Sequence, residues 1–71
     1  MNNQTFADIR RYKNMTMREY AEWLGVSLAT VSDLENGKRD VSANIRAKLA
    51  HRFEVTGEFI EYQRRQQSLS V

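Results

Sequence analysis

The sequence contains no cysteine and no proline, and only three of its 71 residues are glycine. Without cysteine the chain can form neither disulfides nor cysteine-based metal sites, and a single histidine, His51, cannot bind zinc by itself. We therefore expect no metal or other cofactor, and a reducing, cytoplasmic setting. No apolar run approaches the roughly 20 residues that span a bilayer, and the first residues, MNNQTFADIRR, lack the basic-then-apolar order of a signal peptide. The sequence therefore predicts no membrane contact.

The charge of the chain is nearly balanced. Eleven Lys and Arg residues against nine Asp and Glu residues give a formal net charge of +2, which permits binding to nucleic acid without requiring it. The sequence has no paired nucleophile and base, no cluster of metal ligands and no glycine-rich phosphate loop, so it does not predict an enzyme. A length of 71 residues is enough for one small domain, and we expect a single domain over residues 1–71.

Apolar residues recur at helical spacing in five segments, and no strand-like alternation of useful length occurs. The sequence therefore predicts an all-α fold. The expected helices cover about residues 5–13, 16–24 and 28–36, followed by two more that begin after residues 42 and 56. On the inner side of the last helix we expect Phe59 and Ile60, with Tyr62 or Gln63. The periodicity weakens over residues 66–71, where we expect a frayed tail.

The second and third expected helices are joined by a short turn at a glycine. The stretch TMRE, which begins at Thr16, fits a capping box, in which the threonine hydroxyl caps the amide of Glu19. Gly25 suits a left-handed residue at the end of the second helix, and Ser27 suits the N-cap of the third. Two short helices in this arrangement predict a helix-turn-helix, which places its second helix in the major groove of DNA.

The longer stretch MTMREYAEWLGVSLATVSDLENGKR, residues 15–39, resembles the Cro/cI-type, XRE-like helix-turn-helix phage repressor family. The segment FEVTGEFI, residues 53–60, is similar to the entry into the fifth helix of that family. The resemblance covers about residues 6–61. It implies the five-helix lambda-repressor-like fold, double-stranded DNA as the partner, and a homodimer on the DNA. The matching positions in the longer stretch are Thr16, Glu19, Ala21, Leu24, Gly25, Val26, Ser27, Val31, Leu34, Glu35, Asn36, Gly37 and Lys38.

The resemblance also implies roles for residues on and around the third helix. Arg10 matches an arginine of the first helix that pairs with the acid matching Glu35, which would link the two helices and hold Arg10 near a phosphate. Met17 stands where the family often has a phosphate-binding glutamine, so the backbone amides at that helix start and Arg18 would have to substitute for it. The base-facing positions are Leu28, Ala29, Ser32 and Asp33. The positions expected at the DNA backbone are Arg10, Arg11, Met17, Arg18, Ser27, Thr30, Asn36, Lys38 and Arg39.

The base-facing set departs from the usual chemistry of DNA recognition. The stretch from Ser27 to Asp33 holds no Arg, Lys, Gln or Asn, so bidentate contacts with guanine and adenine are excluded there. What remains is apolar contact of Leu28 and Ala29 with thymine methyl groups, hydroxyl contacts, and Asp33 as an acceptor for a cytosine amino group. Asp33 could instead serve solubility or pair with Arg10 or Lys38.

Two functions follow from these observations. The first is a transcriptional repressor of phage, prophage or mobile-element origin that binds a palindromic operator as a dimer and acts by occlusion. The alternative is a protein-interaction module, a co-repressor or anti-repressor that docks on another regulator. The weak base-reading set favours the alternative, as does Trp23 if its indole forms a contact surface; Trp23 could equally be partly buried against a neighbouring helix.

Overall fold

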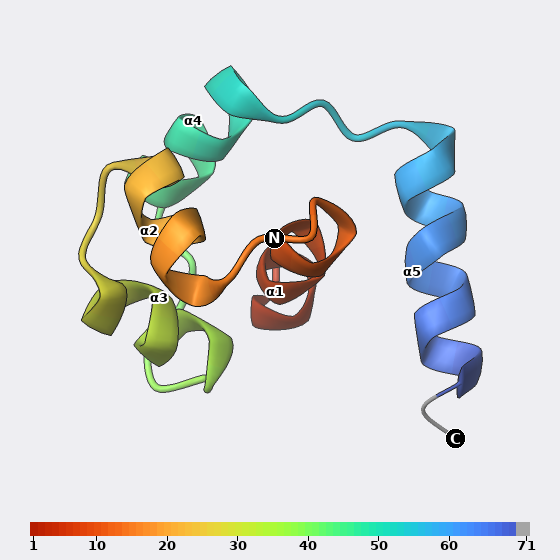
Figure 1. Cartoon of the computed structure of the whole chain (residues 1–71), viewed down its shortest axis with the longest axis horizontal. Helices are drawn as coiled ribbons and strands as arrows, with labels where there is room; N and C mark the ends of the chain where they lie inside the picture. Colours follow the sequence, from red (N-terminus) through yellow and green to blue (C-terminus); the bar gives the residue numbers. More distant parts are fainter. Residues whose placement is uncertain (70–71) are drawn as a thin grey trace.

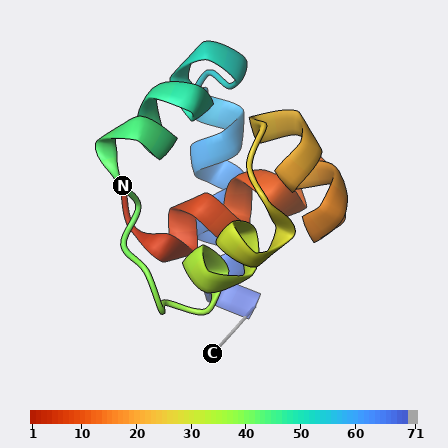
Figure 2. The ribbon, with the colours of Figure 1, turned by 90° about the vertical axis from the view of Figure 1, so that its left-hand side faces the viewer.

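The computed structural model describes residues 1–69 and consists of five helices: α1 (Asn3–Tyr12), α2 (Met17–Leu24), α3 (Leu28–Glu35), α4 (Ala43–Arg52) and α5 (Gly57–Leu69). No strand occurs within these residues, and the predicted all-α class is confirmed. Helix α1 lies at the centre, with α2 and α3 on one side and α5 on the other (Figure 1). In the view turned by 90°, α1 crosses behind α3, which it contacts (Figure 2). None of the described helices is long and apolar enough to cross a membrane.

Each helix begins at a polar side chain that accepts a hydrogen bond from the first turn, which satisfies a backbone amide that has no partner within the helix. The capping box at α2 has both of its bonds, from the Glu19 amide to Thr16 Oγ1 at 3.1 Å and from the Thr16 amide to Glu19 Oε1 at 2.8 Å. Helix α1 starts two residues before the predicted Thr5 because Asn2 is its cap. The remaining caps are Ser27 for α3, Ser42 for α4 and Thr56 for α5.

The turn between α2 and α3 depends on Gly25. Its backbone is left-handed, with φ of +74°, and its amide donates to the carbonyl oxygen of Ala21 at 2.9 Å. The amide of Val26 donates to the same oxygen at 3.0 Å, which completes the end of α2 and redirects the chain into α3. A side chain at position 25 would strain this conformation, although no neighbouring atom would block it.

The core is formed by one apolar cluster to which all five helices contribute. Tyr20 is fully buried, its ring packs 4.8 Å from that of Phe6, and its hydroxyl donates to the Phe6 carbonyl oxygen at 2.8 Å. Burial raises the pKa of the Tyr20 hydroxyl, so this group remains a donor. The cluster consists of Phe6, Ile9, Tyr20, Ala21, Leu24, Val31, Leu34, Ile45, Leu49 and Phe59.

Helix α5 buries a narrower face than the sequence predicts. Phe59 is fully buried and Tyr62 and Gln63 are partly buried, but Ile60 is 56 % exposed, so the expectation that Ile60 faces inward is wrong. Successive helical residues are about 100° apart, and a face centred on positions 59, 62 and 63 turns position 60 to solvent. Of the expected frayed tail, residues 66–69 continue the helix to Leu69, and residues 70–71 lie outside the described residues.

Trp23 lies against the protein rather than standing free. Its indole stacks on the ring of Tyr20 with 5.9 Å between centroids, and it is partly buried. The Nζ atom of Lys13 lies 5.4 Å from the indole centroid, within the range of a cation–π contact. Of the two alternatives for Trp23, the structure therefore shows partial burial, between the core and the end of α1.

Candidate nucleic-acid interface

Helix α3 presents one face to the core and the opposite face to solvent. Val31 and Leu34 are fully buried, and they anchor the helix on the apolar cluster. The opposite face lies on the side of the molecule away from α5 (Figure 1). It holds the four residues expected to face bases, which share one stripe because positions i, i+1, i+4 and i+5 lie on the same side of a helix. Of these, Leu28 (40 % exposed) and Ala29 are exposed, and Ser32 and Asp33 are partly buried.

Local hydrogen bonds hold the polar side chains at both ends of α3. At the N-terminus, Ser27 Oγ accepts from the Thr30 amide at 3.1 Å and lies 2.9 Å from Thr30 Oγ1. At the C-terminus, the Asn36 side-chain amide donates to Ser32 Oγ at 3.3 Å. Each of these groups keeps donor or acceptor capacity for a ligand, because a hydroxyl has two lone pairs and the Asn36 amide has a second hydrogen. The structure thus holds in one orientation four side chains that sequence analysis assigns to DNA contact.

Three exposed cations stand on the segments that precede and follow α3 in the helix-turn-helix. Arg18 stands in the first turn of α2, and Lys38 and Arg39 stand in the loop that follows the left-handed Gly37. Within residues 1–69 none of the three has an ion-pair partner, and Asp33 pairs with neither Arg10 nor Lys38. The Lys38 amide donates to the Asp33 carbonyl oxygen at 2.9 Å, which holds the start of the loop against the end of α3.

Arg10 and Glu35 join α1 to the end of α3. The guanidinium donates from Nε to Glu35 Oε2 at 2.7 Å and from Nη2 to Glu35 Oε1 at 3.0 Å, while Nη1 donates to the Met15 carbonyl oxygen at 3.0 Å. The Arg10 and Glu35 side chains are only 18 % and 7 % exposed. The hydrogen bonds with Glu35 raise the pKa of Arg10. These three bonds link α1 to the end of α3 and leave two of the five guanidinium N–H groups for a phosphate.

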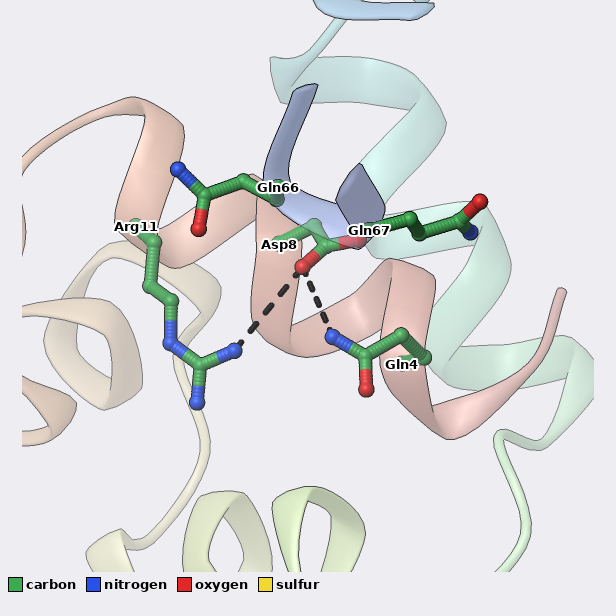
Figure 3. Close-up of a pocket in the computed structure, with 5 residues that line it drawn as sticks. All are labelled: Gln4, Asp8, Arg11, Gln66 and Gln67. Atoms are coloured by element: carbon green, nitrogen blue, oxygen red, sulfur yellow. Dashed lines mark hydrogen bonds and ion pairs between the residues drawn. The ribbon is translucent and has the colours of Figure 1, made fainter. Parts of the chain in front are cut away.

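Arg11 and Met17 each have contacts with other parts of the protein. Arg11 lines a polar pocket between α1 and the end of α5, where its Nη1 atom is 3.8 Å from Asp8 Oδ1 (Figure 3). The Met17 side chain is partly buried against the apolar cluster. Only the backbone of Met17, at the start of α2, could therefore bond to a ligand. The pocket is lined by Gln4, Asp8, Arg11, Gln66 and Gln67.

Two structural residues escape sequence analysis. Asp8 is 2 % exposed and accepts hydrogen bonds from Gln4 Nε2 at 2.9 Å and from Gln63 Nε2 at 3.2 Å. The spacing of Gln4 and Asp8 on one helix could have indicated the first bond, but the second joins residues 55 apart. The Asn3 side chain donates hydrogen bonds to the backbone of α3 and of the loop beyond it, again without a local signal. No group of three or more acidic, histidine or cysteine side chains suited to a metal occurs in residues 1–69.

Comparison with known proteins supports the geometry. A family model described as helix-turn-helix matches residues 7–60, which is more than half of the chain. The matched range contains the whole of α2 and α3 and extends from α1 into α5. The matched family is one of DNA-binding regulatory domains rather than of enzymes. Neither the curated proteins nor the solved structures returned a match.

Replacement of Glu35 should destabilise the fold. In Glu35→Ala the guanidinium of Arg10 stays largely buried without its carboxylate, and we expect the free energy of unfolding to fall by about 3 kcal/mol, the lower end of the range for a broken buried pair. Denaturant titration followed by circular dichroism measures the loss. Glu22→Ala, which removes one exposed carboxylate from α2, is the charge-matched control and should change stability by less than about 0.5 kcal/mol. Equal stability of the two variants would contradict the structural role of the pair.

Proposed function

This chain belongs to the helix-turn-helix family of DNA-binding regulatory domains, and on that basis we propose that it is a sequence-specific transcriptional repressor of phage, prophage or mobile-element origin. One observation carries the proposal: Arg18, at the start of α2, and Lys38 and Arg39, in the loop after α3, are exposed and have no ion-pair partner within residues 1–69. Cations that are not neutralised by the protein are free to replace the counterions of DNA phosphates. Repression would follow from occlusion of the promoter by the bound protein.

In the proposed complex α3 lies in the major groove and the DNA backbone contacts supply most of the affinity. Arg18, Lys38 and Arg39 pair with phosphates, and Ser27 and Asn36 add hydrogen bonds at the two ends of the helix. Leu28 and Ala29 meet thymine methyl groups, since both are exposed and apolar. Ser32 and Thr30 offer hydroxyl contacts, and Asp33 accepts a hydrogen bond from a cytosine amino group.

We further propose that two copies bind a palindromic operator, with half-sites roughly 34–36 Å apart. Two large apolar side chains of α5 remain exposed: Ile60, at 56 %, and Leu69, at 80 %. Tyr62, which lies between them in the sequence, is partly buried. This small area favours a weak dimer in solution. On DNA, two adjacent half-sites raise the effective concentration of the second copy, so that the same contacts suffice.

A second candidate function rests on the composition of α3. Its exposed face offers no cationic or amide side chain between Ser27 and Asp33, and Asp33 presents a carboxylate without an ion-pair partner in the described residues. Such a face would suit contact with another regulatory protein, so that the chain would act as a co-repressor or anti-repressor. Binding to DNA, tested below, separates the two functions.

The first test removes one cation at a time. Lys38→Ala and Arg39→Ala should each weaken binding to all duplexes alike and reduce the slope of log K against log salt by about one, because each loses one phosphate contact. Fluorescence anisotropy with promoter DNA and with random duplex, at several salt concentrations, measures both quantities. Arg52→Ala, which removes an exposed cation from the end of α4, is the charge-matched control and should leave the slope unchanged. If wild-type protein binds no duplex at any salt concentration, the interaction module replaces the repressor.

Asp33→Ala should have a different effect from loss of a cation. Removal of a carboxylate that faces the phosphates strengthens binding to random duplex, while the preference for the operator falls or stays level because the cytosine contact is lost. The same anisotropy assay gives the ratio of operator to random affinity. A fall in random-duplex affinity would contradict the placement of Asp33 in the groove. Glu22→Ala, an exposed acid on the outer side of α2, serves as the control for net charge.

The proposed dimer should form on DNA and dissociate without it. Sedimentation velocity of the free protein at nanomolar to low micromolar concentration should give a monomer, and the complex with a two-half-site duplex should contain two chains per duplex. A duplex with a single half-site should bind one chain more weakly, because it lacks the neighbouring site. A tight dimer at nanomolar concentration in the absence of DNA would contradict the weak association inferred from the small exposed apolar area of α5.

A further inference from the structure

The first residue of α1 is tied to the loop that carries Lys38 and Arg39. The side-chain amide of Asn3 donates to the Leu34 carbonyl oxygen at 2.7 Å and to the Arg39 carbonyl oxygen at 2.7 Å. A primary amide has two hydrogens, so both donors of this group are used. One partner lies in the last turn of α3 and the other in the loop beyond it, 31 and 36 residues along the chain from Asn3. Asn3 thus clamps two backbone segments that meet at the proposed DNA interface.

The loop has few other restraints where Arg39 stands. Residues 36–40 are all exposed, and Gly37 adopts a left-handed conformation with φ of +75°. The amides of Asn36, Gly37 and Lys38 return to carbonyl oxygens of α3, which fixes the start of the loop. Within residues 1–69 the bond from Asn3 is the one hydrogen bond that the backbone of Arg39 makes. The direction in which the Arg39 side chain leaves the loop therefore depends on Asn3.

Asn3 and Arg10 act from the same face of α1, since they stand seven residues, or about two turns, apart. Arg10 donates hydrogen bonds to the carboxylate of Glu35, the last residue of α3. Asn3 donates to the carbonyl oxygens of Leu34, just before that residue, and of Arg39, in the loop after it. The first contact orients the helix, and the second places the loop relative to it. If the loop is already ordered in the free protein, binding to DNA does not have to pay the entropy cost of ordering it, and affinity is higher.

From this geometry we propose that Asn3 is a positioning residue for DNA binding, which holds Arg39 in place for a phosphate contact through the hydrogen bond to the Arg39 carbonyl oxygen. The inference rests on the proposed function, because it assigns to Asn3 an indirect contribution to affinity for the DNA backbone. Asn3 need not touch DNA itself. Its effect on affinity passes entirely through the loop.

A double-mutant cycle tests this route. Asn3→Ala should weaken binding to random duplex by about three- to tenfold, the cost of ordering one or two side chains on binding, and should reduce the salt slope by up to about one. In an Arg39→Ala background the same substitution should have little further effect, because the contact that Asn3 positions is already absent. Losses that add in the double variant would overturn the proposal.

A matched control separates positioning from general loss of stability. Gln63→Ala removes the other long-range amide contacts of α1, to Thr5 Oγ1 and Asp8 Oδ2, and leaves the loop untouched. It should lower the melting temperature at least as much as Asn3→Ala does, yet leave DNA affinity and the salt slope at wild-type values. If Gln63→Ala and Asn3→Ala reduce affinity equally, Asn3 has only a structural role and the proposal is wrong.

A measurement without DNA tests the restraint of the loop by Asn3 separately from the proposed function. In the free protein, ¹⁵N relaxation should show order parameters at Arg39 and Asp40 that fall toward the flexible range, below about 0.6, in Asn3→Ala, while those of α3 stay near wild type. Unchanged order parameters would overturn the proposal even if the chain binds DNA. If Arg39→Ala leaves DNA binding unaffected while the loop loosens as expected, the proposed function is at fault and the clamp itself is not. Should Asn3→Ala not fold, the isosteric Asn3→Asp, which presents acceptors to both carbonyl oxygens, provides the same comparison.

Discussion

The exposed face of α3 depends on the bidentate ion pair between Arg10 and Glu35. An eight-residue helix is too short to be stable alone in water, so α3 takes both its existence and its direction from what it packs against. Val31 and Leu34 attach it to the core and decide which of its faces is buried. The planar guanidinium of Arg10, itself held by the Met15 carbonyl oxygen, adds a directional contact at the end of the helix, because both of its bonds to Glu35 depend on orientation.

The parts of the fold that sequence analysis predicts are those decided by neighbours along the chain. A hydroxyl three residues before an amide is enough to cap a helix, which is why Thr16, Ser27, Ser42 and Thr56 could be identified from spacing. The left-handed turn at Gly25 is local in the same way. The pairing of Arg10 with Glu35 is not local, because these residues are 25 apart, and only the resemblance to a known family predicts it.

The features that could not be predicted are contacts between distant segments. Gln63 bonds to Asp8 and Asn3 bonds to Arg39, and each pair is more than 30 residues apart in the sequence. Nothing in the sequence around Gln63 or Asn3 distinguishes it from a polar residue that faces solvent. Arg11 follows Arg10 directly, yet it turns toward Asp8 and α5, because adjacent helical residues point about 100° apart. The same geometry turns Ile60 to solvent although its neighbour Phe59 is buried. A change of one position along a helix decides whether a side chain meets the core or solvent. Apolar character alone does not show which of two adjacent apolar residues is buried.

The composition of α3 constrains how affinity and specificity can be divided in the proposed complex. Phosphate contacts from Arg18, Lys38 and Arg39 strengthen binding to every sequence equally, so they raise affinity without discrimination. A carboxylate at Asp33 weakens binding to every sequence by repulsion, except where a cytosine amino group offers it a hydrogen bond. Specificity is the difference between two affinities, and it rises when the wrong sequence is penalised as well as when the right one is favoured. An acid on the recognition helix is therefore consistent with reading DNA, provided that the flanking cations hold the protein on the backbone while α3 samples the groove.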